Sequence, residues 1–354
     1  MNTPIPEEIV IQIFTWLPVK SLMRFKCVAK FFNSLVSESY FTEIHTSHSM
    51  IHQGGTKYFL NGTEFYCIAD QQKEYGKSSA SRLVQIRSSV EFPFYIPVGS
   101  NISCVNGLFC IQKPPAILNP STGEVRYLPK LNDDRCLLYY WLGFEPEENK
   151  YKVLLTRDGS GLYIKQCVFT LGVDKSWRKT QSISRCVSYK PGVCINGVIY
   201  RFVFHGGTLA IDAFDLKTES FKLIVLKNSS NWWYYELIEV RSKLAIINCP
   251  TWSCEFFNLR VLRQIQKEEE EEWESHIIHY PSMWKHIPPK IIPHVILSCM
   301  FCDGQILFIL NLESGALWSS YNITRRSWRK LEMKGLSTNH RITGIYSYRE
   351  RLVM

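Results

Sequence analysis

Apolar residues recur at helical spacing near the start of the chain. Ile9, Ile13 and Leu17 lie four positions apart, so they share one face of a helix. Pro6 precedes the run, where the first turn of a helix tolerates proline, and Pro18 ends it. Two further segments before residue 42 repeat the pattern. The sequence therefore predicts three short helices.

These helices carry more apolar residues than a unit of about 40 residues buries by itself. Two explanations remain open at this point. A partner protein covers the surplus apolar face, or the helices form a cap that packs on the rest of the same chain.

From about residue 50 the pattern changes to short apolar strands separated by turns. Residues 104–111, 193–200 and 301–308 each place Asn-Gly or Asp-Gly between two apolar runs, which favours tight hairpins because both central residues adopt positive φ. The turns recur at intervals of about 45 residues, which suits a four-stranded blade. This pattern predicts a mainly β-propeller of six or seven blades.

One interval, between Ser242 and Gly304, is longer than the others and contains the run Lys-Glu-Glu-Glu-Glu-Glu-Trp-Glu at residues 267–274. We expect an acidic loop over residues 262–295, because runs of like charge are usually solvated. The alternative is an acidic recognition element for a basic partner.

The composition narrows the class of protein. Hydrophobic residues make up 45% of the chain and charged residues 21%, which excludes a disordered chain. The first residues lack a basic stretch followed by an apolar one, so we expect a cytoplasmic or nuclear protein. Twelve cysteines are then free thiols in a reducing compartment. The longest uncharged run, residues 92–112, is interrupted by prolines and glycines, so we expect no membrane span.

The net charge of +9 raises the question of nucleic acid. Residues 1–50 hold four basic and four acidic residues, so the excess lies in the remainder. It is dispersed in pairs such as Arg325 and Arg326 instead of forming a stripe. The aromatic run at residues 232–235 favours a buried strand over a base-stacking platform. We therefore expect no nucleic acid partner.

The chain shows no recognisable nucleophile elbow or phosphate-binding loop. Cys299 and Cys302 supply two of the four ligands that a structural zinc needs, and core packing is the favoured interpretation. Four histidines (His276, His279, His286 and His294) are favoured as exposed residues over a second zinc site. We expect no catalytic residue, no metal and no cofactor.

The N-terminal segments resemble the F-box of plant F-box proteins. The residues that carry the likeness are Ile-Pro-Glu-Glu-Ile at 5–9, Leu-Pro-Val-Lys-Ser-Leu at 17–22, Arg-Phe-Lys-Cys-Val at 24–28 and Lys-Phe-Phe-Asn-Ser-Leu-Val at 30–36. The resemblance implies a trihelical module that docks on the Skp-type adaptor of a cullin-based ubiquitin ligase. The positions that it implies as adaptor contacts are Pro6, Ile9, Ile13, Leu17, Pro18, Leu22, Val28 and Phe32. Phe32 departs from the usual Trp, which keeps an aromatic anchor and removes an N–H donor.

The remainder resembles the F-box associated domain of the same plant family, including its S-locus F-box-like branch. The likeness rests on Asn-Gly-Leu at 106–108, Leu-Asn-Pro-Ser-Thr at 118–122, Leu-Gly-Phe at 142–144 before Tyr-Lys-Val at 151–153, and Tyr-Ser-Tyr-Arg-Glu-Arg-Leu at 346–352. It implies a kelch-like β-propeller whose last strand closes the ring by pairing near the first blade.

The expected organisation is an α+β multidomain chain: a trihelical F-box at residues 1–45, a linker at 46–57 and a propeller at 58–354. The expected function is that of a substrate receptor in an SCF (Skp, cullin, F-box) ubiquitin ligase. The F-box would bind the adaptor, and through it the cullin and RING protein, while the propeller recruits an unidentified protein target for ubiquitination and degradation. The target-binding residues are unknown from the sequence. The alternative is a propeller enzyme, a hydrolase or metal-binding protein, with a helical N-terminal cap.

Overall fold

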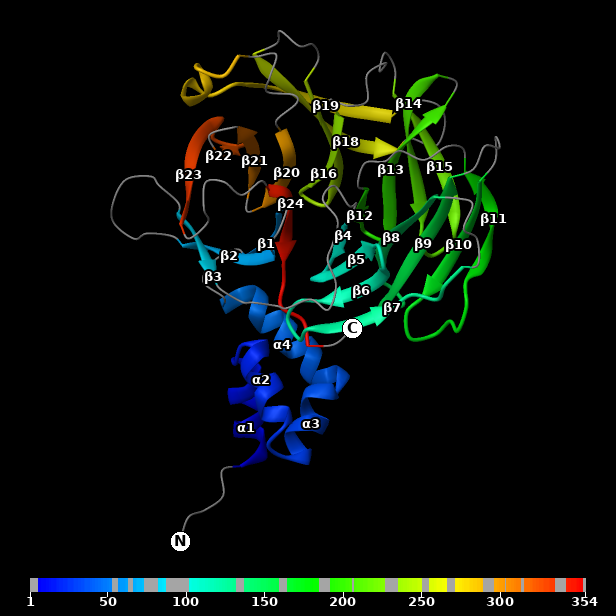
Figure 1. Cartoon of the computed structure of the whole chain (residues 1–354), viewed down its shortest axis with the longest axis vertical. Coiled ribbons are helices and arrows are strands. Elements are labelled where there is room, and N and C mark those ends of the chain that lie inside the picture. Colours follow the sequence, from blue (N-terminus) through cyan, green and yellow to red (C-terminus); the bar gives the residue numbers. More distant parts are fainter. Residues whose placement is uncertain are drawn as a thin grey trace.

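A computed structural model describes most of the chain. The described residues are 6–52, 57–62, 66–72, 82–86, 102–131, 137–158, 164–184, 192–205, 207–226, 235–249, 255–265, 271–288, 296–302, 304–312, 315–334 and 342–352. The helices lie together at one end of the molecule, and the strands form a larger body at the other end (Figure 1). No helix in these ranges is both long enough and apolar enough to cross a membrane.

The helical module, residues 6–52, contains four helices and not the three predicted. They are α1 (Glu7–Thr15), α2 (Val19–Lys26), α3 (Lys30–Ser37) and α4 (Ser39–His52). Pro6 stands at the N-cap of α1, as its sequence position indicated, and Pro18, which was expected to end that helix, stands at the N-cap of α2. Neither proline nor glycine interrupts residues 39–52, and Phe41 and His45, one turn apart, are buried. The fourth helix therefore also occupies residues 46–52, which were expected to belong to a linker.

The described part of the propeller body contains twenty-four strands. They are β1 (Lys57–Gly62), β2 (Tyr66–Gln72), β3 (Arg82–Ile86), β4 (Ser103–Val105), β5 (Leu108–Gln112), β6 (Pro115–Asn119), β7 (Glu124–Tyr127), β8 (Leu137–Glu145), β9 (Lys150–Asp158), β10 (Ile164–Thr170), β11 (Arg178–Ser184), β12 (Val193–Ile195), β13 (Val198–His205), β14 (Thr208–Asp215), β15 (Ser220–Val225), β16 (Tyr235–Val240), β17 (Lys243–Asn248), β18 (Phe256–Ile265), β19 (Glu271–His279), β20 (Ile296–Cys302), β21 (Gln305–Leu312), β22 (Gly315–Asn322), β23 (Ser327–Lys334) and β24 (Ile342–Tyr348).

The strands of the described ranges form five sheets. Four sheets contain four consecutive antiparallel strands each, β4 to β7, β8 to β11, β12 to β15 and β16 to β19. The fifth contains eight strands in the order β20-β21-β22-β23-β3-β2-β1-β24. Successive four-stranded units that return to the first one are the arrangement of a β-propeller.

The described strands form five separate sheets, where the sequence predicted six or seven blades. A short parallel pairing places Glu332 of β23 opposite Arg82 of β3 and joins two four-stranded units into one sheet. The predicted ring closure is confirmed, since the last strand pairs with the first and places Ile345 opposite Leu60.

The predicted Asn-Gly hairpin turns are present. Asn106 and Gly107 have φ values of 50° and 82°, and Asn196 and Gly197 have values of 48° and 80°, as tight hairpin turns require. Gly107 has a second reason to be glycine. A Cβ atom there would clash with the carbonyl oxygen of Arg349.

The predicted acidic loop at residues 262–295 is largely structured. The strands β18 and β19 form an antiparallel hairpin in which Leu262 is opposite Trp273. Arg263 forms ion pairs with Glu272 and Glu274 at 3.3 and 3.1 Å. These pairs offset the negative charge of the two glutamates, so the repulsion that favours a solvated loop is reduced. After the hairpin, a short 3₁₀ helix at Ser282–Trp284 buries Trp284 in the core. Residues 266–270 and 289–295 lie outside the described ranges.

The C-terminal segment, residues 349–352, joins the two parts of the molecule. Leu352 is buried in the same cluster as Val19 and Leu22 of the helical module. Glu350 accepts a hydrogen bond from the backbone N–H of Val19 at 3.1 Å and forms an ion pair with Lys57 at 2.6 Å. One carboxylate therefore contacts both the first turn of α2 and the first strand of the body.

The same segment is anchored to the sheet that contains β6. The side-chain amide of Asn119 donates a hydrogen bond to the carbonyl oxygen of Arg351 at 3.0 Å, and the backbone N–H of Arg351 donates to Ser121 Oγ at 2.9 Å. The helical module thus packs on the propeller body through residues 349–352, which directly follow the ring-closing strand β24 (Figure 1).

Candidate adaptor-binding surface

The helical module buries one set of apolar side chains and exposes another. Its core contains Phe14, Val19, Leu22, Leu35, Val36 and Phe41. The exposed large apolar residues are Ile9, Ile13, Trp16, Phe25, Val28, Phe31 and Tyr40. An uncovered apolar surface of this kind on a small module is typical of a protein-binding site. The cap explanation therefore holds in part, because the module packs on its own chain. The apolar face that stays open is what the partner explanation requires.

Seven of the eight predicted contact residues reach the surface to different degrees. Val28 is 72% exposed, and Ile9 and Ile13 are exposed along α1. The two N-cap prolines, Pro6 and Pro18, are also exposed. Leu17 and Phe32 are half-buried and pack against the core of the module.

Leu22 does not belong to this surface, and the prediction is corrected here. Its side chain is 0% exposed and lies in the core of the module. The helical pattern identified Leu22 as apolar but did not distinguish the face that packs on α3 and Leu352 from the face that is left open. We assign Leu22 to the fold and not to a contact.

Phe32 connects the exposed aromatic rings to the core. Its ring stacks on that of Phe14 with centroids 4.7 Å apart and an interplanar angle of 8°. The exposed rings of Phe25 and Phe31 contact Phe32 edge-on at 5.7 and 5.3 Å. Phe32 therefore supports its neighbours by packing, a role that does not require the N–H of a tryptophan.

The sequence interpretation missed four exposed residues of the module, namely Trp16, Phe25, Phe31 and Tyr40. Spacing gave a signal for two of them: Trp16 follows Ile9 by seven residues and Ile13 by three, and Phe25 precedes Val28 by three. The ring of Trp16 lies 4.8 Å from that of His48 in α4. No spacing rule identified Phe31 or Tyr40.

Charge is distributed unevenly around the helices. Glu7 and Glu8 stand in the first turn of α1, and Arg24 and Lys26 in the last turn of α2. Each pair complements the partial charge of its helix end. The apolar face is therefore flanked by charges that also stabilise the helices.

His45 is a buried titratable group behind this surface. Its Nε2 atom lies 2.8 Å from the carbonyl oxygen of Leu17 and therefore donates to it, while its Nδ1 atom has no hydrogen-bond partner in the described structure. Burial lowers the pKa of His45 below its ordinary value of 6.5, against the opposing effects of the Leu17 hydrogen bond and of Glu350. The folded module therefore favours the neutral imidazole at this position.

Three cysteines of the body, Cys104, Cys110 and Cys194, are poor nucleophiles. Burial raises the pKa of the Cys104 and Cys110 thiols to about 12 and that of Cys194 to about 11. The protonated thiol, which is much less reactive than the thiolate, is the dominant form at neutral pH.

The residues considered for metal binding are separated or lie partly outside the description. Cys299 and Cys302 belong to β20, but their side chains are not described. His276 and His279 lie in β19, His286 is exposed beyond the 3₁₀ helix, and His294 is outside the described ranges. Within those ranges, no three His, Cys, Asp or Glu residues are grouped so that they could hold an ion.

The aromatic run at residues 232–235 is described only at its last position. Tyr235 begins β16 and packs against the buried cluster that includes Phe202. This position agrees with a strand packed in the body.

Comparison with known proteins matches both parts of the chain. A family model described as "F-box domain" matches residues 4–44, and one described as "F-box associated beta propeller domain" matches residues 57–352. F-box protein DOR of Arabidopsis thaliana is 29% identical over 94% of this chain and 89% of its own length. Putative F-box protein At1g47730 of the same plant is 26% identical over 95% of this chain and 87% of its own length.

Among solved structures, TolB from Acinetobacter baumannii superposes with a TM-score of 0.47 at 15% sequence identity, over 87% of this chain and 73% of that chain.

Proposed function

Because the chain belongs to the plant F-box proteins that carry an F-box associated β-propeller domain, we propose that it is a substrate-receptor subunit of an SCF-type ubiquitin ligase. The helical module would bind a Skp-type adaptor and, through it, a cullin and a RING protein. The propeller body would hold a protein target for ubiquitination and degradation, in the cytoplasm or the nucleus.

The apolar face of the helical module is the observation that carries this proposal. Ile9, Ile13 and Val28 are exposed although the module already has a packed core and a contact with the C-terminal segment. Solvent exposure of these side chains is unfavourable at about 25 cal/mol per Å² of apolar surface. A partner that covers them gains this free energy on binding.

In this role the chain accelerates ubiquitin transfer by proximity. Holding the target beside the ubiquitin-loaded conjugating enzyme makes attack by a target lysine nearly intramolecular, which raises its effective concentration. The chain itself needs no catalytic residue for this step. No described group of residues favours the alternative of a propeller enzyme.

The proposal is tested by co-purification of the full-length protein with a Skp-type adaptor. The double variant Ile13→Asp with Val28→Asp buries two carboxylates in the interface, so we expect adaptor binding to weaken by at least about 100-fold. The matched control is Val173→Asp, at a residue of the body that is 59% exposed, and it should bind the adaptor normally.

The same variants separate the two halves of the proposal. Proteins bound by the body should co-purify with the double variant as well as with the wild type, since the body is unchanged. An unchanged affinity of the double variant for the adaptor would place the contact elsewhere and contradict the assignment.

A further inference from the structure

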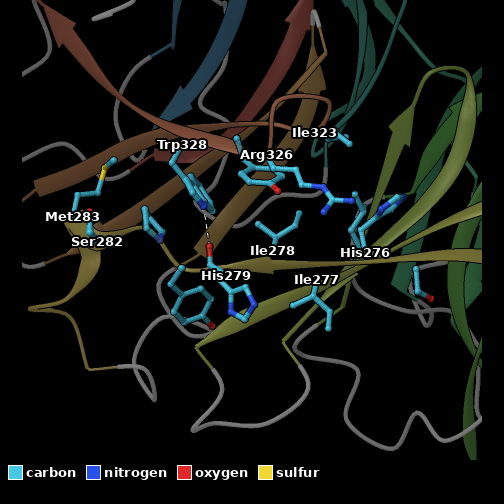
Figure 2. Close-up of a pocket in the computed structure, with 14 residues that line it drawn as sticks. His276, Ile277, Ile278, His279, Ser282, Met283, Ile323, Arg326 and Trp328 are labelled. Carbon is cyan, nitrogen blue, oxygen red and sulfur yellow. Dashed lines mark hydrogen bonds between the residues drawn. The ribbon is translucent and has the colours of Figure 1, made fainter.

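The outer edge of the sheet formed by β16 to β19 adjoins a pocket. Among the described strands, β19 pairs only with β18 and forms that edge. The pocket has a volume of about 780 Å³ and lies between β19, the chain that follows it and the β22–β23 hairpin of the neighbouring sheet (Figure 2). This edge lies at the end of the molecule opposite the helical module (Figure 1). A ligand here would not compete with the adaptor for space.

The backbone of β19 presents hydrogen-bonding groups toward this edge. The N–H of Tyr280 donates to Glu255 across the hairpin at 2.8 Å. Since the direction of backbone groups alternates along a strand, those of Ile278 also face β18, while those of Ile277 and His279 face outward. The indole N–H of Trp328 donates to the carbonyl oxygen of His279 at 2.8 Å (Figure 2), which confirms this alternation.

The outward-facing backbone N–H and C=O groups of Ser275 and Ile277 lie further along this edge than His279, whose carbonyl oxygen binds Trp328. The Ile277 side chain is 59% exposed. Unpaired groups of an edge strand form a template for an additional strand. The preferred ligand of this edge is therefore an extended polypeptide.

The pocket beside this edge carries positive charge. Its lining includes Arg326, His276 and His279 and contains no carboxylate. Arg326 stands in the turn between β22 and β23 with φ of 51° and forms no ion pair with any described residue. Arg326 and His276 lie on the same side of the pocket (Figure 2). An arginine without a carboxylate partner is well suited to bind one from a ligand.

The other lining groups provide an apolar wall. The ring of Trp328 lies 5.1 Å from that of Tyr321 and 5.1 Å from that of the buried Trp284. Ile278 is buried beneath the pocket. These rings are held in place by the core, so an apolar side chain would contact a preformed surface.

The opposite end of β19 is acidic, and two of its carboxylates are already paired. Glu272 and Glu274 bind Arg263, and His276 lies 3.0 Å from Glu274. This pairing weakens the interpretation of the acidic run as a site for a basic partner. The acidic end also limits where an acidic ligand segment can bind, because the glutamates that precede Ser275 in β19 would repel its carboxylates.

We propose that the β19 edge binds an extended acidic segment of the target protein. The segment pairs as an additional strand with Ser275 and Ile277. One of its carboxylates binds Arg326, and one of its apolar side chains packs against Trp328. The inference rests on the proposed receptor function and specifies the chemistry of the target.

The test is a selection of random twelve-residue peptides by the purified complex of the full chain with its adaptor. We expect enriched peptides to contain Asp or Glu next to apolar residues of high strand propensity. A synthetic enriched peptide labelled with fluorescein then serves as the probe for affinity measurements on variants.

Two matched pairs of variants distinguish the contribution of backbone hydrogen bonds to peptide binding from the contribution of charge. Ile277→Pro removes an outward N–H without breaking the β18 ladder and should weaken peptide binding roughly three- to tenfold, whereas Ile277→Ala keeps the N–H and should have a smaller effect. Arg326→Glu should weaken binding at least about tenfold, and Arg326→Lys should retain most of it. Melting temperature and adaptor affinity of each variant establish that the fold is intact.

Several results would overturn the proposal. The first is enrichment of basic or uncharged peptides, and the second is enrichment of acidic peptides whose affinity is insensitive to Arg326→Glu. The third is a dimer of the chain that Ile277→Pro dissociates, because a second copy would then occupy the β19 edge. Adaptor affinity is measured on the same samples, so failure of this inference is distinguished from failure of the receptor function.

Discussion

In the helical module, Leu22 is fully buried while Val28, six residues later, is the most exposed of its large apolar side chains. In the propeller body, β21 buries six consecutive residues, from Ile306 to Asn311, between its neighbours. Short helices expose one face whenever only the other is packed, whereas a strand between adjacent blades is covered on both faces. Apolar residues of the module therefore either form its core or stay exposed on its surface, whereas those of the body mostly form the core.

The comparison predicts opposite effects of the same substitution at Leu22 and Ile13. Leu22→Asp places a carboxylate in the module core and should lower the free energy of unfolding of the module by about 5 kcal/mol, comparable to the whole stability of a small unit. Ile13→Asp should leave stability nearly unchanged and remove adaptor binding. Circular dichroism during thermal unfolding, together with adaptor co-purification, checks both. Equal loss of stability in the two variants would remove the distinction between core and surface.

Leu352 tests whether the module depends on the body for its core. Leu352→Ala removes a buried side chain that only the C-terminal segment supplies, so we expect a loss of about 2 to 4 kcal/mol in stability of the module. Limited proteolysis should then cleave within α1 to α4 before the body. Val173→Ala, at an exposed position of the body, is the control. An unchanged proteolysis pattern would show that the module is stable alone.

Glu350 tests the polar part of the same joint. Glu350→Gln keeps an acceptor for the N–H of Val19 but removes the charge paired with Lys57, whose side chain is 17% exposed. We expect a loss of about 1 to 2 kcal/mol, measured by urea unfolding. Glu124→Gln breaks an exposed pair with Arg126 and should change stability by less than about 0.5 kcal/mol. Similar values for both variants would mean that the joint is no stronger than a surface ion pair.

Sequence reasoning succeeded where local rules decide the structure. Pro6 marked the start of the first helix and Pro18 its end, and Asn106-Gly107 and Asn196-Gly197 marked hairpin turns, because each residue restricts its own backbone. It failed where distant segments meet. The parallel contact of β23 with β3 and the burial of Leu22 against Leu352 depend on residues more than two hundred positions apart.

The acidic run shows a third kind of failure. Composition alone favoured a solvated loop, yet Glu272 and Glu274 lie in a strand because Arg263, on the paired strand, offsets their charge and Trp273 packs inward. Deleting residues 267–274 would therefore remove part of β19 and not a dispensable loop. The pocket beside β19 had no sequence signal, since Arg326 and His276 come from different sheets.

The smallest predicted effect concerns pH and is confined to the helical module. The pKa of His45 is lowered in the folded state, so below pH 6.5 the unfolded chain takes up a proton that the folded module does not. Stability from His45 is therefore complete above pH 6.5 and decreases as the pH falls toward the lower pKa of the folded state. Hydrogen exchange at pH 7.5 and pH 5.5, corrected for the intrinsic rate, should show loss of protection in α1 and α4 before β5 and β6. His45→Gln retains a donor for Leu17 and should flatten this dependence, and an equal loss of protection in the body would show that a different group titrates.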